Sequence, residues 1–517
     1  MLEQWPYTDL HNLNLDWILA KVKQNEENIA NLFAITPGAS DTQTVSVKDY
    51  GAKGDGSTDD SDAIQKCLNA TNSAYFPVGN YYIAKSISLP NNSNLYFDNC
   101  GIVIPNTVTA FINSARNVKI CGKCAVKGGA SSYFVLFNDN NTCLISGFFT
   151  YDGFGNGAVY NGYKGQNIKI EGRHSTNNAP IVVLNCCSDI DVSGIYAVYN
   201  TDIGNCAINI VTDETNYAFK NIHIHNNYID NNKHTISACI NISRLDPVSK
   251  LVYNPRGKNW IACDNINVHD NTCLNGKNPC DGIDVLYCSN VRITNNIVNS
   301  CFEGIAILSD DVCCANNICI QNDSCGIALG DYTLGSNGTN FTSITLTGNL
   351  LFANGEGSGQ YVIPAGIGMV QPESCYIATL YAVNNVIATS KYGLYSGANS
   401  GGSNLVFVGN MITGTTGSIY SPNDGLYTQM VTSNNPGINP RGFLTPPTIS
   451  TQNVANNYGC NVQVSIINGT TEQLLYVNDI ALTVLKPNSV TTFTLPPLAK
   501  MRVATSGEGC SMAWFGL

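Results

Sequence analysis

Three glycines in the middle of the chain recur at a fixed spacing, and this repeat constrains the fold more than any other feature. Gly282, Gly304 and Gly326 stand 22 residues apart each time, and each is followed by a short apolar run. A fixed period of about 20 to 50 residues is typical of solenoids, and short strands without a helical pattern between them favour a parallel β-helix. Its coils lie about 4.8 Å apart. Residues one period apart therefore stack in rows and can share a site.

The length and the charge of the chain fit this architecture. One compact core rarely supports 517 residues, but a solenoid grows by adding coils end to end. Charged residues make up only 12% of the chain, and the formal net charge is -11. This charge argues against a nucleic-acid partner, whose phosphates require Lys and Arg, and favours a neutral or cationic partner.

The 21 cysteines are expected to be reduced and buried. The first 20 residues contain no Lys, no Arg and no apolar signal core, so folding in a reducing cytoplasm is favoured over a secreted disulfide framework. Cys319, for example, stands inside Ile-Cys-Ile, where a strand would carry an aliphatic residue. Cys121 and Cys124 have the spacing of half a zinc site, but no second pair accompanies them, so no metal or other cofactor is expected. No apolar run reaches the roughly 18 residues of a membrane span.

Residues 1 to 33 have a pattern of their own. An amphipathic helix is predicted there from a heptad seam of Leu15, Ile18, Val22, Ile29 and Leu32. Asn25 lies on the seam, where a polar residue can fix the oligomeric state; the alternative is a helix packed on its own domain. The runs Trp5 to Asp9 and Leu13 to Trp17 resemble the N-termini of appendage and fibre proteins of short-tailed bacteriophages. This resemblance implies that residues 1–33 dock onto tail or collar proteins of a virion, with a linker up to residue 44.

The next motif is the most specific one in the chain. Val47 to Gln65, with the glycines of Tyr-Gly-Ala-Lys-Gly-Asp-Gly, and Tyr75 to Tyr81 closely resemble the opening of the pectate-lyase-like superfamily of right-handed parallel β-helix proteins, which includes phage tailspikes. Asp59 and Asp62 are predicted to cap a helix whose apolar face is Ile64, Cys67 and Leu68. Such a helix would cover the open first coil, in a cap of residues 45–105, so its acidic cluster is read as structural.

The body, residues 106–438, repeats irregularly. Segments of the form Asn-x-apolar-x-apolar recur and are followed by polar turns with Asn, as at 226–227, 295–296 and 384–385. Because Asn tolerates the left-handed turn conformation and can bond its counterpart on the next coil, these residues are expected to form ladders. His223 and His225 alternate with Ile222 and Ile224, so they are expected to face outward as ordinary surface residues. Inserts at about 242–260 and 353–364 should become flanking loops that could border a groove.

Residues 439–517 follow a proline-rich break and alternate as strands do, which predicts a small antiparallel β-sandwich. Similar endings occur on phage fibre proteins, and this resemblance implies closure of a trimer or a carbohydrate contact. Together with the heptad pattern of the start, it leads us to expect a homotrimer.

The region 278–331 is the candidate active site. Asn278 to Asp284 and Phe302-Glu303-Gly304 resemble the active-site coils of polygalacturonases. However, Phe302 replaces one acid, Cys325 stands where the histidine of that family belongs, and no Arg-Ile-Lys follows. A true polygalacturonase is therefore not expected.

A pair of carboxylates remains after this comparison. Asp281 and Glu303 are 22 residues apart, hence neighbours on adjacent coils, and Asp284 points out of the strand beside them. Glycoside hydrolysis needs two carboxyls about 5 to 9.5 Å apart, one of them protonated. We therefore assign Asp281, Glu303 and Asp284 to catalysis and Asp331 to substrate binding. Asp310 with Asp311 could form an equivalent pair elsewhere, and outward acids are often only solvated.

Three functions are compatible with these patterns. The first is a phage tailspike or appendage that binds and hydrolyses a host cell-surface polysaccharide. The second is a receptor-binding fibre of the same shape without catalysis, and the third is a structural appendage or collar component. A calcium-dependent lyase is disfavoured because no compact acidic cluster is followed by a base. In each case the expected location is the virion, after assembly in the host cytoplasm.

Overall fold

In a computed structural model of the chain, the residues described here are 45–139, 141–155, 158–214, 217–232, 237–244, 263–276, 279–330, 339–358, 362–369, 375–388, 390–396, 402–413, 417–420, 427–433, 435, 442–444, 451–456, 461–496, 499–504 and 510–516. The predicted attachment module of residues 1–44 lies outside them. Within the described part, no helix is long and apolar enough to cross a membrane.

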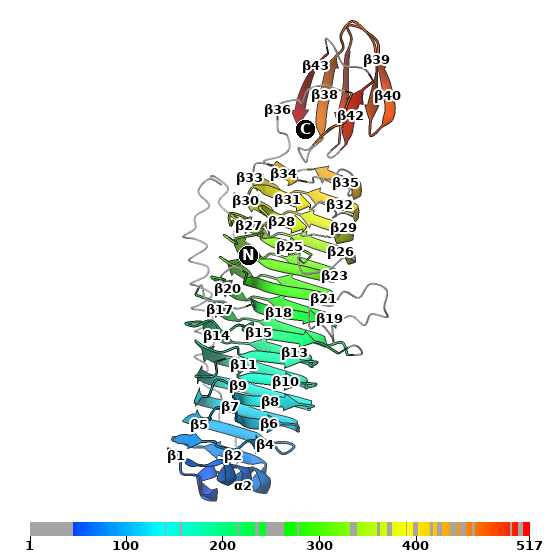
Figure 1. The fold of residues 1–517 in the computed structure, drawn as a ribbon. Coiled ribbons are helices and arrows are strands. Elements are labelled where there is room, and N and C mark those ends of the chain that lie inside the picture. The colour runs from blue at the N-terminus through cyan, green and yellow to red at the C-terminus, as the bar shows by residue number, and fades with distance from the viewer. Residues whose placement is uncertain are drawn as a thin grey trace, which may run out of the picture.

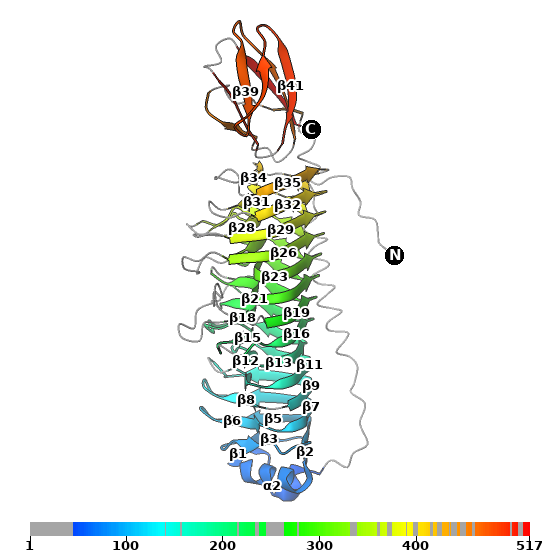
Figure 2. The same ribbon diagram turned by 90° about the vertical axis from the view of Figure 1, so that its right-hand side faces the viewer.

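The body is a parallel β-helix, as predicted, in which each coil contributes strands to three parallel sheets (Figure 1, Figure 2). The first sheet contains β4 (Ile87–Ser88), β6 (Thr109–Asn113), β8 (Tyr133–Asn138), β10 (Tyr160–Tyr163), β12 (Val182–Asn185), β15 (Ile208–Thr212), β18 (Ala238–Arg244), the first halves of β21 (Asp281–Thr294) and β23 (Ile305–Ala315), β25 (Ile327–Leu329), β28 (Ala365–Met369), β31 (Tyr392–Ser396) and β34 (Gly417–Tyr420).

The second sheet contains β2 (Ser73–Phe76), the first halves of β5 (Asn94–Val103), β7 (Arg116–Lys127), β9 (Asn141–Asp152) and β11 (Gln166–Thr176), then β13 (Ser188–Ser193), β16 (Lys220–His225), β19 (Cys263–His269), the second halves of β21 and β23, β26 (Thr339–Thr347), β29 (Cys375–Val383), β32 (Gly402–Val408) and β35 (Tyr427–Ser433). The third sheet contains β1 (Asp55–Asp59), β3 (Asn80–Tyr82), the second halves of β5, β7, β9 and β11, then β14 (Ile195–Val198), β17 (Tyr228–Asp230), β20 (Thr272–Leu274), β22 (Ile297–Asn299), β24 (Ile318–Ile320), β27 (Leu350–Phe352), β30 (Val386–Ala388) and β33 (Met411–Thr413).

The end of the helix near residue 60 is closed by a cap, but the capping residue differs from the prediction. A 3₁₀ helix, Val47–Tyr50, precedes the α-helix α2, Ser61–Thr71, which covers the first coil (Figure 1). The N-cap position is Asp60, not Asp59, but the Asp60 carboxylate makes no capping bond and accepts instead from the N–H groups of Lys53 and Gly54 at 2.6 and 3.1 Å. The Asp59 carboxylate accepts from the N–H of Ser61, the first residue of the helix, at 3.0 Å. The predicted apolar face of the helix is confirmed: its members, Ile64, Cys67 and Leu68, are fully buried.

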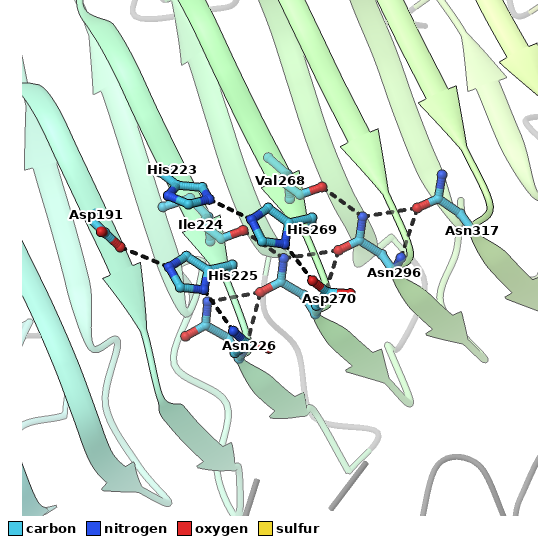
Figure 3. Close-up of polar contacts among 12 residues, drawn as sticks. Asp191, His223, Ile224, His225, Asn226, Val268, His269, Asp270, Asn296 and Asn317 are labelled. Carbon is cyan, nitrogen blue, oxygen red and sulfur yellow. Dashed lines mark hydrogen bonds and ion pairs between the residues drawn. The ribbon is translucent and has the colours of Figure 1, made fainter. Parts of the chain in front are cut away.

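Buried asparagines form the predicted ladder along one turn of the coils. In each pair, the first residue has the left-handed conformation, with φ of 53° at Asn226 and 57° at Asn295, and the second carries the ladder. Each ladder amide nitrogen donates to the amide oxygen of the next coil at 2.9–3.2 Å, as Figure 3 shows for Asn296 and Asn317. The members are at most 1% exposed: Asn227, Asn271, Asn296, Asn317, Asn349, Asn385, Asn410 and Asn435.

The thiols are buried as expected. Nineteen cysteines of the described part carry no disulfide, and all of them except Cys121, Cys313 and Cys510 are buried. Their reduced state in solution stays a prediction. In the core a thiol packs as a small apolar group.

The C-terminal part is built of two antiparallel sheets, which confirms the predicted sandwich strands (Figure 1). One contains β36 (Gly442–Leu444), β43 (Ser511–Gly516), β38 (Val462–Ile467) and β41 (Val490–Leu495). The other contains β37 (Val454–Ala455), β42 (Lys500–Val503), β39 (Gln473–Val477) and β40 (Ile480–Leu485). The edge strands β40 and β41 expose apolar side chains, with Ile480 at 73%, Leu482 at 52% and Val490 at 65%. Neighbouring chains of the expected trimer would cover such a surface.

The asparagine ladder should contribute strongly to stability. Asn317→Ala removes donors to Asn349 Oδ1 and Ile293 O and leaves buried groups of Asn296 without their acceptor. Because each unsatisfied buried group costs about 1–3 kcal/mol, we expect the free energy of unfolding to fall by roughly 3 kcal/mol in guanidinium titrations. The half-buried Asn404, with one long 3.4 Å bond to Thr379, is the matched control, and Asn404→Ala should cost under about 1 kcal/mol. Equal losses for both variants would contradict this role of the ladder.

The exposed apolar edge provides a test of the trimer. Leu482→Asp, combined with Ile480→Asp, should convert the trimer to monomers in light scattering, because it places charges where apolar side chains would pack between chains. Lys66→Asp, at an exposed position of the capping helix α2, should leave the trimer intact. A wild-type protein that stays monomeric at micromolar concentration refutes the expected assembly.

Candidate functional site

The structure brings two of the predicted catalytic acids together. Asp281 is the first residue of β21, and Glu303 lies two residues before β23 on the next coil. The backbone N–H of Glu303 donates to Asp281 Oδ1 at 2.9 Å, and the N–H of Gly282 donates to the Glu303 carbonyl at 3.0 Å. The spacing of 22 residues therefore corresponds to one coil, as the sequence indicated.

The repeated glycines are what allow the coils to approach at this point. A Cβ atom on Gly304 would lie 2.2 Å from the carbonyl oxygen of Gly326, and one on Gly282 would lie 2.5 Å from that of Gly304. Real Cβ atoms do not come so close to a backbone oxygen. The glycines that define the repeat are thus required by close packing beside the acids.

The acids lie in a largely buried setting. Glu303 is 5% exposed, whereas Asp281 and Asp284 are half-buried. Burial, and then the negative charges of Glu303 and Asp281, raise the pKa of the Cys325 thiol well above its ordinary value. Burial, and then the charge of Asp284, do the same for the pKa of Cys206. The negative charges of all three carboxylates therefore raise the pKa of buried thiols nearby.

Asp284 belongs to an outward row of the first sheet, in register with Asn241 on one side and Ala306 on the other. Beyond it, Ala306 and Ala328 form an apolar cluster with Ile363, which comes from the predicted insert at 353–364. Ile363 of this insert therefore packs on the row next to the acids. Asp331, assigned to substrate binding, lies outside the described residues, so its assignment stays a prediction.

A second candidate site, a groove on the third sheet, has no counterpart in the sequence predictions. It consists of two adjoining depressions of about 500 and 350 Å³ that share Thr150, Arg173 and Ser175. Ala125, Thr150 and Ser175 stand in register on β7, β9 and β11, so three small side chains lie side by side. Tyr196 of β14 follows in the same row and lines the second depression. We call this the third-sheet groove.

The cations of the third-sheet groove have no carboxylate partner among the described residues. Lys123, Phe148 and Arg173 form the row next to the small side chains. The Arg173 guanidinium lies over the Tyr196 ring at 4.5 Å, and Tyr196 in turn stacks on Tyr228 with ring centroids 5.0 Å apart. Among the ion pairs of the described residues, none involves Lys123 or Arg173. Two unneutralised cations beside aromatic rings suit an anionic ligand with apolar faces.

A sequence signal for this groove existed in a second glycine repeat. Gly122, Gly147 and Gly172 stand 25 residues apart, and each directly precedes a residue of the row of Lys123, Phe148 and Arg173. Their φ angles of 113°, 139° and 106° bend β7, β9 and β11 from the second sheet into the third. The change of period from 25 to 22 residues along the chain hides this repeat from a search with one fixed spacing.

Comparisons with known proteins agree with the fold. Residues 44–306 match the family model described as rhamnogalacturonase A/epimerase, pectate lyase-like. A pre-neck appendage protein of Bacillus phage B103 is 29% identical over 300 residues, which cover 56% of this chain and 29% of that protein. An alginate lyase of Azotobacter vinelandii is 36% identical over 136 residues, which cover 22% of this chain and 15% of that protein. The chain thus spans less than a third of the length of these relatives.

Among solved structures, tailspike protein 3 of bacteriophage CBA120 superimposes with a TM-score of 0.52 at 14% identity, covering 84% of this chain and 70% of that chain. At this identity, the likeness concerns the fold. The family model covers half of the chain, and it includes the capping motif, the third-sheet groove and the acid pair. The chain belongs to the pectate-lyase-like family of parallel β-helix proteins and is related to bacteriophage appendage proteins.

Proposed function

We propose that this protein is a virion appendage that binds a polysaccharide of the host cell surface in the third-sheet groove. The observation that carries the proposal is the pair of cations, Lys123 and Arg173, which lie in the groove without an ion-pair partner among the described residues. Residues 1–33 would attach the protein to tail or collar proteins, and three chains would assemble side by side. The phage appendage relatives support the location, and the relative named an alginate lyase acts on a polysaccharide.

The chemistry of the groove favours a glycan with carboxylate groups. A guanidinium binds a carboxylate through two parallel hydrogen bonds, and stacking on Tyr196 holds the Arg173 side chain in place before a ligand arrives. Phe148 and Tyr196 offer aromatic surface to the C–H faces of sugar rings, and Thr150 and Ser175 offer hydroxyls to their polar edges. The row of small side chains leaves room for a chain of sugars.

The net charge of -11 suggests a neutral or cationic partner, but it averages over the whole molecule. At physiological salt, charges more than about 8 Å away are largely screened, so the cations inside the groove dominate for a bound ligand. The local charge therefore outweighs the global one, and we expect an anionic polysaccharide.

We expect Lys123→Gln and Arg173→Gln each to weaken binding of an acidic capsule or wall polysaccharide by roughly tenfold or more. A charge-assisted hydrogen bond contributes about 1.5–3 kcal/mol, and the loss should shrink at high salt. Titration calorimetry over a salt series measures both effects. Lys119→Gln is the control, because Lys119 is an exposed lysine of the same strand on the other side of the Gly122 bend. Equal loss in all three variants would contradict the groove as the binding site.

Hydrolysis is the finer part of the proposed function. Asp281 and Glu303 would act as the acid and the base or nucleophile, with Asp284 orienting water or sugar and Asp331 contacting the substrate. The hydrogen bond from the Glu303 backbone to Asp281 supports their pairing. A specific observation favours the second candidate, a receptor-binding appendage without catalysis: Glu303 is only 5% exposed, and a polysaccharide must reach both carboxyls.

The two candidates are separated by amide variants. If the protein hydrolyses the glycan, Asp281→Asn and Glu303→Gln should each lower the release of reducing ends at least roughly a hundredfold, because an amide cannot transfer the proton. Binding and folding should persist, since the Asp281→Asn amide keeps an oxygen that can accept from the Glu303 N–H. Asp311→Asn, at an exposed position with φ of 51° that asparagine tolerates, is the control. Full activity of both amides would place the catalytic site elsewhere, and wild-type binding without any cleavage would establish the receptor-binding candidate.

A further inference from the structure

Three histidines and an aspartate from successive coils meet on the outer face of the second sheet. Asp191 comes from β13, His223 and His225 from β16, and His269 from β19. The register places Asp191 opposite His223, and His225 opposite His269. Because Ile222 and Ile224 point into the core, the two histidines of β16 point outward, as the sequence predicted. They are, however, half-buried members of a cluster rather than isolated surface residues (Figure 3).

The nitrogen and oxygen atoms of this cluster converge. His225 Nε2 lies 3.0 Å from Asp191 Oδ1, and His223 Nε2 faces His269 Nε2 at 2.5 Å. One potential ligand atom from each of Asp191, His223 and His225 lies within 4.8 Å of the others. In a tetrahedral site with bonds of about 2.0–2.2 Å, neighbouring ligand atoms are roughly 3.3–3.6 Å apart. His269 lies outside this group of three, although its Nε2 faces His223, so side-chain rotations must direct the four ligand atoms at one point.

The outer partner of His269 favours a lone pair that points toward His223. His269 Nδ1 lies 2.6 Å from Asp270 Oδ2, so it carries the proton and leaves Nε2 unprotonated toward His223. His225 Nδ1 accepts from the Asn226 amide nitrogen at 2.8 Å, so His225 Nε2 carries the proton toward Asp191, and metal binding would displace that proton. Lys169 is 3.9 Å from Asp191 but 2.9 Å from Glu171, so Glu171 offsets its charge.

We propose that Asp191, His223, His225 and His269 bind one divalent transition-metal ion of the zinc, nickel or copper class. Imidazole nitrogens with one carboxylate oxygen are ligands of this class, whereas calcium and magnesium prefer oxygen ligands. The ion would join β13, β16 and β19, and thereby link three successive coils. The ligands lie on the second sheet, so the proposal does not depend on the glycan groove of the third sheet. It differs from the sequence-based expectation of no metal, which rested on cysteine spacing.

The test uses untagged full-length protein that has been treated with a chelator and dialysed. Titration with Co²⁺ should give saturable visible absorption bands at one ion per chain, and Zn²⁺ should displace the Co²⁺ and raise the unfolding temperature. We expect His223→Gln and His269→Gln each to weaken Co²⁺ binding at least about a hundredfold and to abolish the Zn²⁺-dependent shift. Asp270→Asn, which keeps the ring partner but removes its charge, should weaken binding about tenfold. Asn267→Ala, an outward residue of the same strand β19, should bind as the wild type does.

Two results would overturn the proposal. One is a wild-type protein with no saturable Co²⁺ binding at about 100 μM metal. The other is binding that survives unchanged in His223→Gln, His269→Gln and Asp270→Asn, because the ion would then lie elsewhere. Circular dichroism of each variant without metal shows whether the variant is folded, so that a lost signal can be assigned to a lost ligand. If a histidine variant does not fold, the weaker Co²⁺ binding expected for Asp270→Asn still tests the proposal.

Discussion

In-register hydrogen bonding between parallel coils is the constraint on which this structure depends. Each strand of the body pairs with its equivalents one coil before and after, so side chains at one position stack along the molecule. A polar side chain in the core can then form its hydrogen bonds with the same residue type on the next coil, as in the ladder from Asn227 to Asn435. A backbone that approaches its neighbour closely must be glycine in every coil, as at Gly282 and Gly304. Outward side chains stack in rows for the same reason, and the candidate binding surfaces consist of such rows.

The parts of the fold that repeat could be predicted from the sequence. The 22-residue spacing of the glycines predicted the length of one coil. The asparagine pairs predicted both the left-handed turns and the ladder, because asparagine recurs at these two positions in successive coils. The acid pair was placed on adjacent coils for the same reason. The N-cap position was misplaced by one residue, and the local motif does not show that the Asp60 carboxylate bonds Lys53 and Gly54 instead of the helix.

The sites that the sequence missed depend on coils of unequal length. His225 and His269 are neighbours across one coil although they are 44 residues apart in sequence, and Asp191 and His223 are 32 apart. Lys123 and Arg173 stand two coils of 25 residues apart. No single period relates these residues, so only the register of the strands brings them together. The burial of the acid pair could not be predicted either. The spacing of Asp281 and Glu303 does not show that Glu303 is almost fully buried.

In the function that we propose, the third-sheet groove, and not the acid pair, holds the glycan. A crystal structure of the protein with oligosaccharides of an acidic host glycan tests this directly. We expect sugar density over Thr150 and Ser175, with a carboxylate group against the Arg173 guanidinium and Lys123. Density confined to the surroundings of Asp281 and Glu303, with the groove empty at saturating ligand, would contradict it.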